Sequence, residues 1–390
     1  MNQIKALVCV GLLLASGCTR SAYQDPAAKP TGFTSKPEYA ARGYGQVSLR
    51  PDGKILLFTE CSALVEPKMS CYVLALDLES KQLYRYDLDN EFGYLHAKYS
   101  PSGQNIVMTR YPQIDTLDPN GRMRIDEGQI TMMRCDGSNF KVLTTSPGVV
   151  AFPAVSPDDA RVSFAQGELR APGSKSIAAG WEIWEHDLST QKNQLFGGLF
   201  NFFTLSQVQY LNNDRLLINA YGPRSIWQQS QRAPKSVNIN DEVFLLDRSA
   251  SELSRPDLAT TPSLGTPSYK SSAVANKNSI VYNAYFENAI PPKSGFFMVT
   301  PIANTIEILY PYRLSTSGIP SISIDNAGKK MAFVFEIEGG QRLDKALGLI
   351  DIATSRWSNL TVPPLEGATP ISTLLQPALV LCSSAVKPHK

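Results

Sequence analysis

The stretch RPDGKILLFTE, residues 50–60, joins a Pro-Asp-Gly turn directly to a short apolar run. Proline presets the backbone of a turn, aspartate caps it through its side chain, and glycine accepts the positive φ that many tight turns need. A turn of this kind before an apolar run is typical of a corner between two paired β-strands. A looser copy, SPSGQNIVMTR, starts at Ser100. The recurrence indicates that the corner belongs to a repeat.

The turn followed by an apolar run occurs six times, at spacings of 50 to 64 residues. Two more short apolar runs around a polar turn follow each copy, and a few residues before the first turn form another, so every unit contains four candidate strands. Four short strands in a period of about 50 residues are typical of a propeller blade. We therefore predict an all-β fold, a six-bladed β-propeller of four-stranded antiparallel blades over residues 44–363. The copies begin at Arg50, Ser100, Ser156, Tyr210, Val274 and Asp325.

Radial stacking explains why such a repeat would close into one structure. A single blade has two faces that it cannot bury alone, whereas neighbours in a ring bury both faces and leave only short edges exposed. The alternative is a β-sandwich or a β-helix with fortuitous turns. Segments with the hydrophobic periodicity of an amphipathic helix are essentially absent, so the propeller and its alternatives are all all-β folds.

Several of these turns resemble the repeat of a known family. RPDGK from Arg50, SPSG from Ser100 and SPDD from Ser156 are similar to the SPDGK-type repeat of TolB-like six-bladed propellers. DGSN, which follows Cys135, resembles the hairpin between the third and fourth strands of that family. TolB carries an N-terminal α/β domain where this chain has a short polar segment. The resemblance therefore implies the propeller fold and not the TolB role.

The charge balance excludes one class of partner. The chain of 390 residues has 37 Lys and Arg against 35 Asp and Glu, a net charge of +2. No overall field therefore attracts nucleic acid. The charged share of 18%, with 16 Tyr and 16 Phe, is typical of a turn-rich β protein with a well-filled core.

The N-terminal sequence predicts export. Lys5 precedes an apolar run over residues 6–15, which is too short to span a bilayer as a helix of about 20 residues. Residues 1–17 therefore indicate a signal peptide. The segment LASGC, ending at Cys18, resembles the bacterial lipobox. The alternative is a plain secretory signal in which Cys18 has no role.

The lipobox resemblance implies that Cys18 becomes the first mature residue and carries a thioether-linked diacylglycerol and an amide-linked acyl chain, such as palmitate. Two or three chains anchor a protein stably where one would be marginal. In Gram-negative lipoproteins an Asp after the Cys favours inner-membrane retention, and here that residue is Thr19. We therefore expect an outer-membrane lipoprotein that faces the periplasm. Residues 18–43, rich in proline and small residues, predict a flexible tether.

The long connections of the predicted propeller all lie on one face. Links between the second and third strands, and between blades, emerge opposite the tight turns, and long loops on a rigid scaffold commonly carry binding sites. Aromatic and arginine side chains are enriched at protein interfaces. About half of the aromatic side chains in these links are expected to pack under their own loops instead of binding a partner. The predicted binding-face residues are His96, Tyr111, Arg122, Arg124, Tyr221, Arg224, Trp227, Arg232, Tyr285 and Phe286.

Metal and cofactor motifs are not evident. The three histidines, His96, His186 and His389, have no metal-ligand spacing. Residues 115–127, DTLDPNGRMRIDE, resemble a calcium loop in composition, but the spacing misses the EF-hand pattern and two arginines offset the charge. A Gly-x-Ser-x-Gly elbow and a glycine-rich phosphate loop are also missing from the sequence. We therefore expect no metal, no cofactor and no catalytic residue.

The cysteines suit an oxidising compartment. Cys61 and Cys71 flank the link between the second and third strands of the first blade, and a hairpin can place them opposite each other as a disulfide. Cys135 ends a predicted strand, and Cys382 lies in a C-terminal extension, residues 364–390. These two either pair, if the extension folds back, or stay as free thiols.

These observations predict a lipid-anchored scaffold of the cell envelope. Its long-loop face would bind a protein, a peptide or a glycan, without catalysis and without nucleic acid. The alternative is an enzyme. TolB-like propellers include polysaccharide lyases, which place histidine and basic residues around the axis, and here the candidate is His96.

Overall fold

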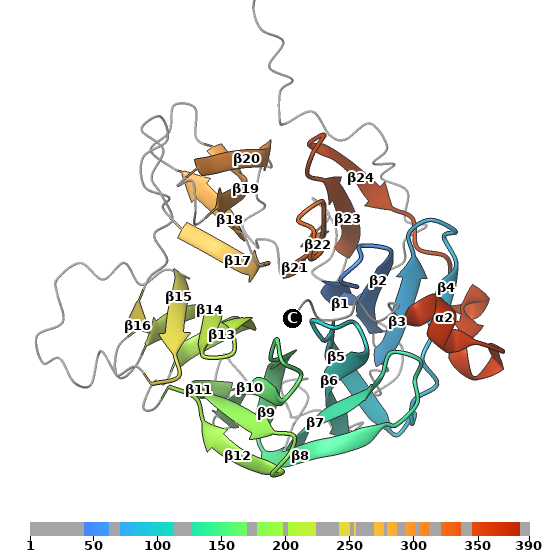
Figure 1. Cartoon of the computed structure of the whole chain (residues 1–390), viewed down its shortest axis with the longest axis horizontal. Coiled ribbons are helices and arrows are strands. Elements are labelled where there is room, and N and C mark those ends of the chain that lie inside the picture. The colour runs from blue at the N-terminus through green and yellow to red at the C-terminus, as the bar shows by residue number, and fades with distance from the viewer. Residues whose placement is uncertain are drawn as a thin grey trace, which may run out of the picture.

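The computed structural model describes thirteen segments of the chain, and the strands form antiparallel sheets arranged radially around a central axis (Figure 1). The predicted signal peptide, Cys18 and nearly all of the tether lie outside the described residues. No helix among the described residues is long and apolar enough to cross a membrane. The described segments are residues 43–61, 71–112, 127–169, 178–197, 202–223, 242–249, 253–254, 269–276, 279–286, 293–300, 305–311, 321–336 and 345–382.

Each sequence repeat forms one unit of four consecutive strands, and we number these units one to six. Unit one has β1 (Gly43–Leu49), β2 (Ile55–Cys61), β3 (Cys71–Asp77) and β4 (Leu83–Arg85). Unit two has β5 (Phe92–Tyr99), β6 (Asn105–Pro112), β7 (Glu127–Arg134) and β8 (Lys141–Pro147). Unit three has β9 (Val149–Val155), β10 (Arg161–Leu169), β11 (Ala178–Asp187) and β12 (Lys192–Leu195).

The second half of the chain repeats the same order. Unit four has β13 (Phe202–Asn212), β14 (Arg215–Pro223), β15 (Glu242–Asp247) and β16 (Leu253–Ser254). Unit five has β17 (Tyr269–Ala275), β18 (Ile280–Phe286), β19 (Lys293–Thr300) and β20 (Thr305–Pro311). Unit six has β21 (Ser321–Ile324), β22 (Lys330–Glu336), β23 (Lys345–Asp351) and β24 (Arg356–Leu360).

The predicted count of six separate blades differs from the hydrogen-bonded sheets. The described strands pair into five sheets, because units three and four share one sheet of eight strands. β11 begins with a segment that extends beyond its pairing with β12, and there Trp181 pairs with Phe202 of β13. Counted by sheets, the propeller has five blades, one of them of double width. The prediction of four-stranded antiparallel units is confirmed.

The stretch that begins at Arg50 forms the β1–β2 corner, as predicted. Gly53 adopts a φ of 69°, and its backbone N–H donates to the Arg50 carbonyl at 2.7 Å. The Asp52 carboxylate accepts hydrogen bonds from the Arg50 guanidinium and from the Lys54 backbone N–H. The same N–H to carbonyl bond recurs between Gly103 and Ser100. In the first three copies the corner is thus encoded by one proline, one capping acid or serine, and one left-handed residue.

Side-chain hydrogen bonds close the ring between the last and first units. The Ser321 hydroxyl accepts from the Val47 backbone N–H at 3.2 Å, and Ser323 accepts from Leu49 at 2.8 Å. The first strand of each unit contacts the first strand of the next, and β21 contacts β1. Hydrogen bonds to two serine hydroxyls of β21 therefore connect unit six to unit one, although the two units share no sheet.

The C-terminal extension packs against units one and two. It contains the short helical turns η1 (Leu365–Gly367) and η2 (Ile371–Thr373), the strand β25 (Thr369–Pro370) and the helix α2 (Pro377–Leu381). β25 pairs in parallel with β4 and so covers the outer edge of unit one. Ile371 and Leu381 are buried in the core cluster between the two units. The extension therefore acts as part of the folded ring.

Both pairs of cysteines are disulfides. The predicted Cys61–Cys71 bridge is confirmed and joins the facing ends of β2 and β3. Cys135 bonds to Cys382, which decides between the two alternatives left open by the sequence. This second bridge ties the end of the extension to unit two.

Candidate functional site

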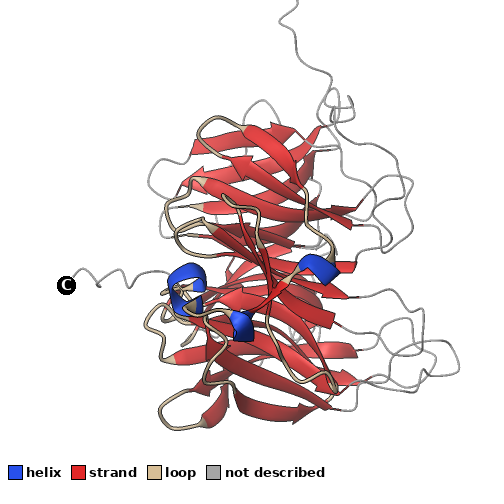
Figure 2. Ribbon diagram, turned by 90° about the vertical axis from the view of Figure 1, so that its right-hand side faces the viewer, coloured by secondary structure: helices blue, strands red, loops and turns tan. Residues whose placement is uncertain are grey.

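The antiparallel order gives the ring two distinct rims. The turns between first and second strands, and between third and fourth strands, lie on one rim, which we call the turn rim. The links between second and third strands and between units lie on the other, the link rim. Figure 2 shows the ring edge-on, with strands running from one rim to the other. Four of the predicted binding residues lie near strand ends next to the link rim: Tyr111, Tyr221, Tyr285 and Phe286.

The structure accounts for only part of the predicted binding face. Five of the ten residues lie outside the described segments, and for Tyr221, Tyr285 and Phe286 the description covers the strand but not the side chain. Tyr111 is a core residue: it is buried, and its hydroxyl donates to the Val150 carbonyl. The remaining residue, His96, lies in β5, the inner strand of unit two. The five residues outside the described segments are Arg122, Arg124, Arg224, Trp227 and Arg232.

His96 lies at an irregularity in the inner strand β5. The register of β5 against β6 shifts between Leu95 and Lys98, and His96 adopts a φ of 55°. Its Nδ1 lies 3.0 Å from the hydroxyl of Thr109, and that hydroxyl donates to the Leu95 carbonyl. Thr109 has one proton, so His96 Nδ1 must be the donor in this pair. Nε2 is left as a lone-pair acceptor without a partner among the described residues.

An aromatic side chain from the next unit lies beside the His96 ring. Phe152 lies at the corresponding register shift in β9 and adopts a φ of 53°. The ring centres of His96 and Phe152 are 4.6 Å apart, and Trp181 lies 6.3 Å beyond Phe152. Left-handed backbone at residues other than glycine costs about 1–3 kcal/mol each and is concentrated at functional sites. Two such residues in contact make this inner region a candidate site.

Lys98 adds a cation to the same region. Its Nζ donates to the Val208 carbonyl of β13 at 3.1 Å, so the side chain reaches from unit two to unit four. No carboxylate among the described residues pairs with it. Burial lowers the pKa of Lys98 to about 8. Burial and the charge of Lys98 lower the pKa of His96 to about 3. At neutral pH the site therefore combines a neutral imidazole with an ammonium group.

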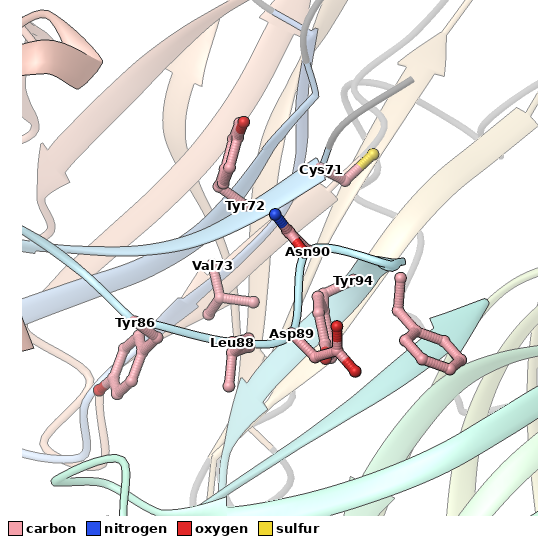
Figure 3. Close-up of a pocket in the computed structure, with 9 residues that line it drawn as sticks. Cys71, Tyr72, Val73, Tyr86, Leu88, Asp89, Asn90 and Tyr94 are labelled. Atoms are coloured by element: carbon pink, nitrogen blue, oxygen red, sulfur yellow. The ribbon is translucent and has the colours of Figure 1, made fainter. Parts of the chain in front are cut away.

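A second site is a shallow pocket at the link rim, between units one and two (Figure 3). Its position follows from the chain path, because residues 86–91 run from the end of β4 to the start of β5. The Cys61–Cys71 bridge fixes the adjacent end of β3. The lining includes four aromatic residues, one carboxylate and one amide. The Tyr72 ring points away from the pocket and packs on the face of β3 that lies toward unit six. The lining residues are Cys71, Tyr72, Val73, Tyr86, Leu88, Asp89, Asn90, Phe92 and Tyr94.

A cation also supports this pocket. The Arg110 guanidinium lies 3.3 Å from the centre of the Phe92 ring and bonds to the Asp89 carboxylate at 3.2 Å. The Tyr94 side chain is 2% exposed, and burial raises the pKa of its hydroxyl. That hydroxyl donates to no acceptor among the described residues. An unpaired buried donor costs about 1–3 kcal/mol, and because this hydroxyl has essentially no exposed surface, it is not accessible from the pocket.

The described part of the chain holds no group of three or more side chains that could bind a metal ion. His186 is 1% exposed, and its Nδ1 bonds to the Asn193 side chain at 2.7 Å. It is therefore a core histidine. The run considered for calcium lies almost wholly outside the described residues.

Sequence reasoning missed several residues of both sites. Lys98, Phe152 and Trp181 lie in strands that are rich in apolar residues, and no local pattern marks them as site residues. Asp89 and Asn90 lie in the connection between β4 and β5. The signal that could have found the pocket is the alternation YDLDNEFGY over residues 86–94, which interleaves aromatic and acidic side chains.

Solved structures share this arrangement of strands. TolB from Acinetobacter baumannii superposes with a TM-score of 0.52 at 14% identity, covering 81% of this chain and 63% of its own. The fold is a TolB-like β-propeller. Oligogalacturonate lyase in complex with manganese superposes with a TM-score of 0.51 at 11% identity, covering 84% of this chain and 81% of its own. No family model and no curated protein matches the chain.

At these identities the likeness shows the fold alone. The chain spans just under two thirds of the length of the TolB chain. The manganese in the lyase structure is a property of that protein, and the described residues of this chain offer no comparable cluster. The function must therefore be inferred from the two sites themselves.

Proposed function

We propose that this protein is a lipid-anchored scaffold of the cell envelope that binds a protein, a peptide or a glycan through its link rim and catalyses no reaction. The lipobox at Cys18 and the tether over residues 18–43 support the anchor, and Thr19 supports the outer membrane facing the periplasm. The propeller would then stand about 25–30 Å from the membrane surface, the typical span of such a tether.

We also propose that the ring is functionally six-bladed. A single residue pair, Trp181 with Phe202, joins β11 of unit three to β13 of unit four. Each unit otherwise keeps its own four strands, and the six inner strands contact one another in a closed cycle. The double-width sheet would behave as two blades with one shared pair.

The observation that carries the binding role is the link-rim pocket. It combines the half-buried ring of Phe92 with the exposed carboxylate of Asp89 and the exposed amide of Asn90, on the rim that faces away from the tight turns. The buried carboxylate of Glu185, near the turn rim, is instead paired internally with Arg248. Concave surfaces with a few convergent polar groups are the usual places for ligands.

This role can be tested with the full lipoprotein purified in detergent. Asp89→Ala and Asn90→Ala, made together, should remove most of the envelope material retained after reversible crosslinking. Leu195→Ala, an exposed apolar change on β12, should retain the wild-type amount. Equal retention by all three proteins would contradict binding at the link rim.

The enzyme alternative has one observation in its favour, the neutral imidazole of His96 with a free Nε2. A lyase of this kind needs a base to remove a proton next to a carboxyl group. Unsaturated sugar formed from envelope polysaccharide by the native protein, but not by His96→Ala, would establish that alternative. No unsaturated product from either protein is the result that the scaffold predicts.

A further inference from the structure

We propose that the side chains around His96 form a second binding site of the scaffold, for the C-terminal carboxylate of a polypeptide whose last side chain is apolar. These side chains, which we call the His96 site, are His96, Lys98, Phe152 and Trp181. They lie on the inner strands β5 and β9 and on β11 (Figure 1). The site is separate from the link-rim pocket, and its role rests on the proposed scaffold function.

Lys98 supplies the positive charge for a carboxylate. Its side chain is half-buried, and Nζ donates one hydrogen bond, to the Val208 carbonyl at 3.1 Å. An ammonium group has three donors, so two remain for a ligand. No acidic side chain among the described residues pairs with Lys98, and a desolvated cation without a partner is unfavourable. An anion bound beside Nζ would offset part of that cost.

His96 supplies a hydrogen-bond acceptor. Its Nδ1 donates to the Thr109 hydroxyl, so Nε2 is the unprotonated nitrogen of the neutral ring. The Nε2 of His186 is buried, whereas that of His96 keeps accessible surface. The last residue of a polypeptide carries both groups that suit this site, an N–H that can donate to Nε2 and a carboxylate that can accept from Lys98.

Phe152 and Trp181 supply the apolar surface. Both rings pack against the core cluster of units three and four, and both are half-buried, so each keeps accessible surface. An apolar side chain gains from such a surface, whereas the many hydroxyls of a sugar would need polar partners there. The aromatic pair therefore favours a peptide over a glycan.

The backbone of this site is strained. His96 and Phe152 adopt φ angles of 55° and 53°, each at a register shift of its inner strand. Glycine would adopt this conformation readily, yet both positions carry rings, and the ring centres are 4.6 Å apart. Strained residues of this kind are concentrated at functional sites. The strain therefore supports a binding role for these two rings.

The experiment is a titration of the full lipoprotein in detergent with acetylated tripeptides, followed by calorimetry and saturation-transfer NMR. Acetyl-Ala-Ala-Leu with a free carboxylate should bind with a Kd on the order of 1 mM, as expected for one small site. Its C-terminal amide should bind at least tenfold more weakly, because it lacks the charge that pairs with Lys98. Acetyl-Ala-Ala-Gly with a free carboxylate should bind at least fivefold more weakly, because it lacks the apolar side chain.

Variants locate the binding. Lys98→Met should bring the affinities of the acid and the amide to within twofold, whereas Lys192→Met, on the exposed strand β12, should keep the wild-type preference. Phe152→Gly removes the ring and relieves the backbone strain, and it should abolish the preference for the peptide that ends in leucine. Cooperative thermal unfolding shows that the variants fold, and the comparison of acid with amide on the native protein does not depend on them.

Three results with the peptides would overturn the inference: no binding of the acid, equal binding of acid and amide by the native protein, or an acid preference that survives in Lys98→Met. Tighter binding of digalacturonate than of acetyl-Ala-Ala-Leu would also overturn it, in favour of an acidic glycan. Retention of envelope material that depends on Asp89 and Asn90, without binding of any tripeptide, would sink this inference and leave the scaffold role standing.

Discussion

Replacement of Arg248 by alanine should destabilise the propeller strongly, because it removes the partner of a buried carboxylate. Glu185 of β11 is fully buried and accepts hydrogen bonds from the Arg248 guanidinium and, at 2.6 Å, from the Tyr210 hydroxyl of β13. The group thus joins units three and four, which share the double-width sheet. Arg248 also lies 4.8 Å from the centre of the Phe196 ring.

The expected loss is about 3–5 kcal/mol, the usual cost of leaving a buried charge without its partner. Arg215→Ala is the matched control, since Arg215 pairs with Asp247 in the same unit, but both side chains are at least one-third exposed. That pair should contribute at most about 1 kcal/mol. Urea unfolding followed by circular dichroism measures both variants, provided that their m-values agree.

The pH dependence of the free energy of unfolding gives an independent check of the Glu185–Arg248 pair. Hydrogen bonds from Arg248 lower the pKa of Glu185 against the effect of burial. Its paired carboxylate therefore stabilises the native protein above the unfolded pKa of about 4.3, and this stabilisation is lost as pH falls through the lower folded pKa. Without Arg248, burial raises the pKa of Glu185, so protonation relieves the defect. The stability gap between wild type and Arg248→Ala should shrink between pH 7 and pH 4.

Two results would show that this reasoning is wrong. One is a loss in Arg248→Ala no larger than that in Arg215→Ala. The other is a gap that stays constant with pH. Either would mean that the carboxylate of Glu185 finds adequate partners without the guanidinium.

Three further changes have defined outcomes. Replacement of Cys135 and Cys382 by serine should cost up to about 5 kcal/mol in urea unfolding on the chain-entropy model, because the bridge spans 247 residues; a cost below about 1 kcal/mol would argue against the extension as part of the fold. Lys98→Met should raise the pKa of His96 above about 3, since the charge of Lys98 lowers it, and an unchanged imidazole titration by NMR would contradict their proximity. Cys18→Ala should abolish incorporation of labelled fatty acid and release the protein from membranes, and continued labelling would disprove the anchor.

Local sequence patterns were sufficient to predict the repeat architecture. The turn at Gly53, with its positive φ, and the short Cys61–Cys71 bridge both depend on residues close together in the chain. The four-strand unit follows from alternation within about 50 residues. These features were predictable because each depends only on residues within one repeat.

Features that depend on distant parts of the chain were not predictable. The fusion of units three and four depends on one pairing, Trp181 with Phe202, at the end of an extended strand. The position of Cys382 depends on how the extension packs against β4. Lys98 reaches a carbonyl 110 residues away, and no local pattern predicts that contact. The candidate sites were therefore found by the structure, although His96 was named in advance.

Site-specific photo-crosslinking in living cells tests the proposed binding role most directly. A benzophenone side chain placed at position 90, in the link-rim pocket, should form an adduct with an envelope component, and the same group at position 195 on the outer strand β12 should not. Adducts of equal yield from both positions, or none from position 90, would contradict a binding site at the link rim.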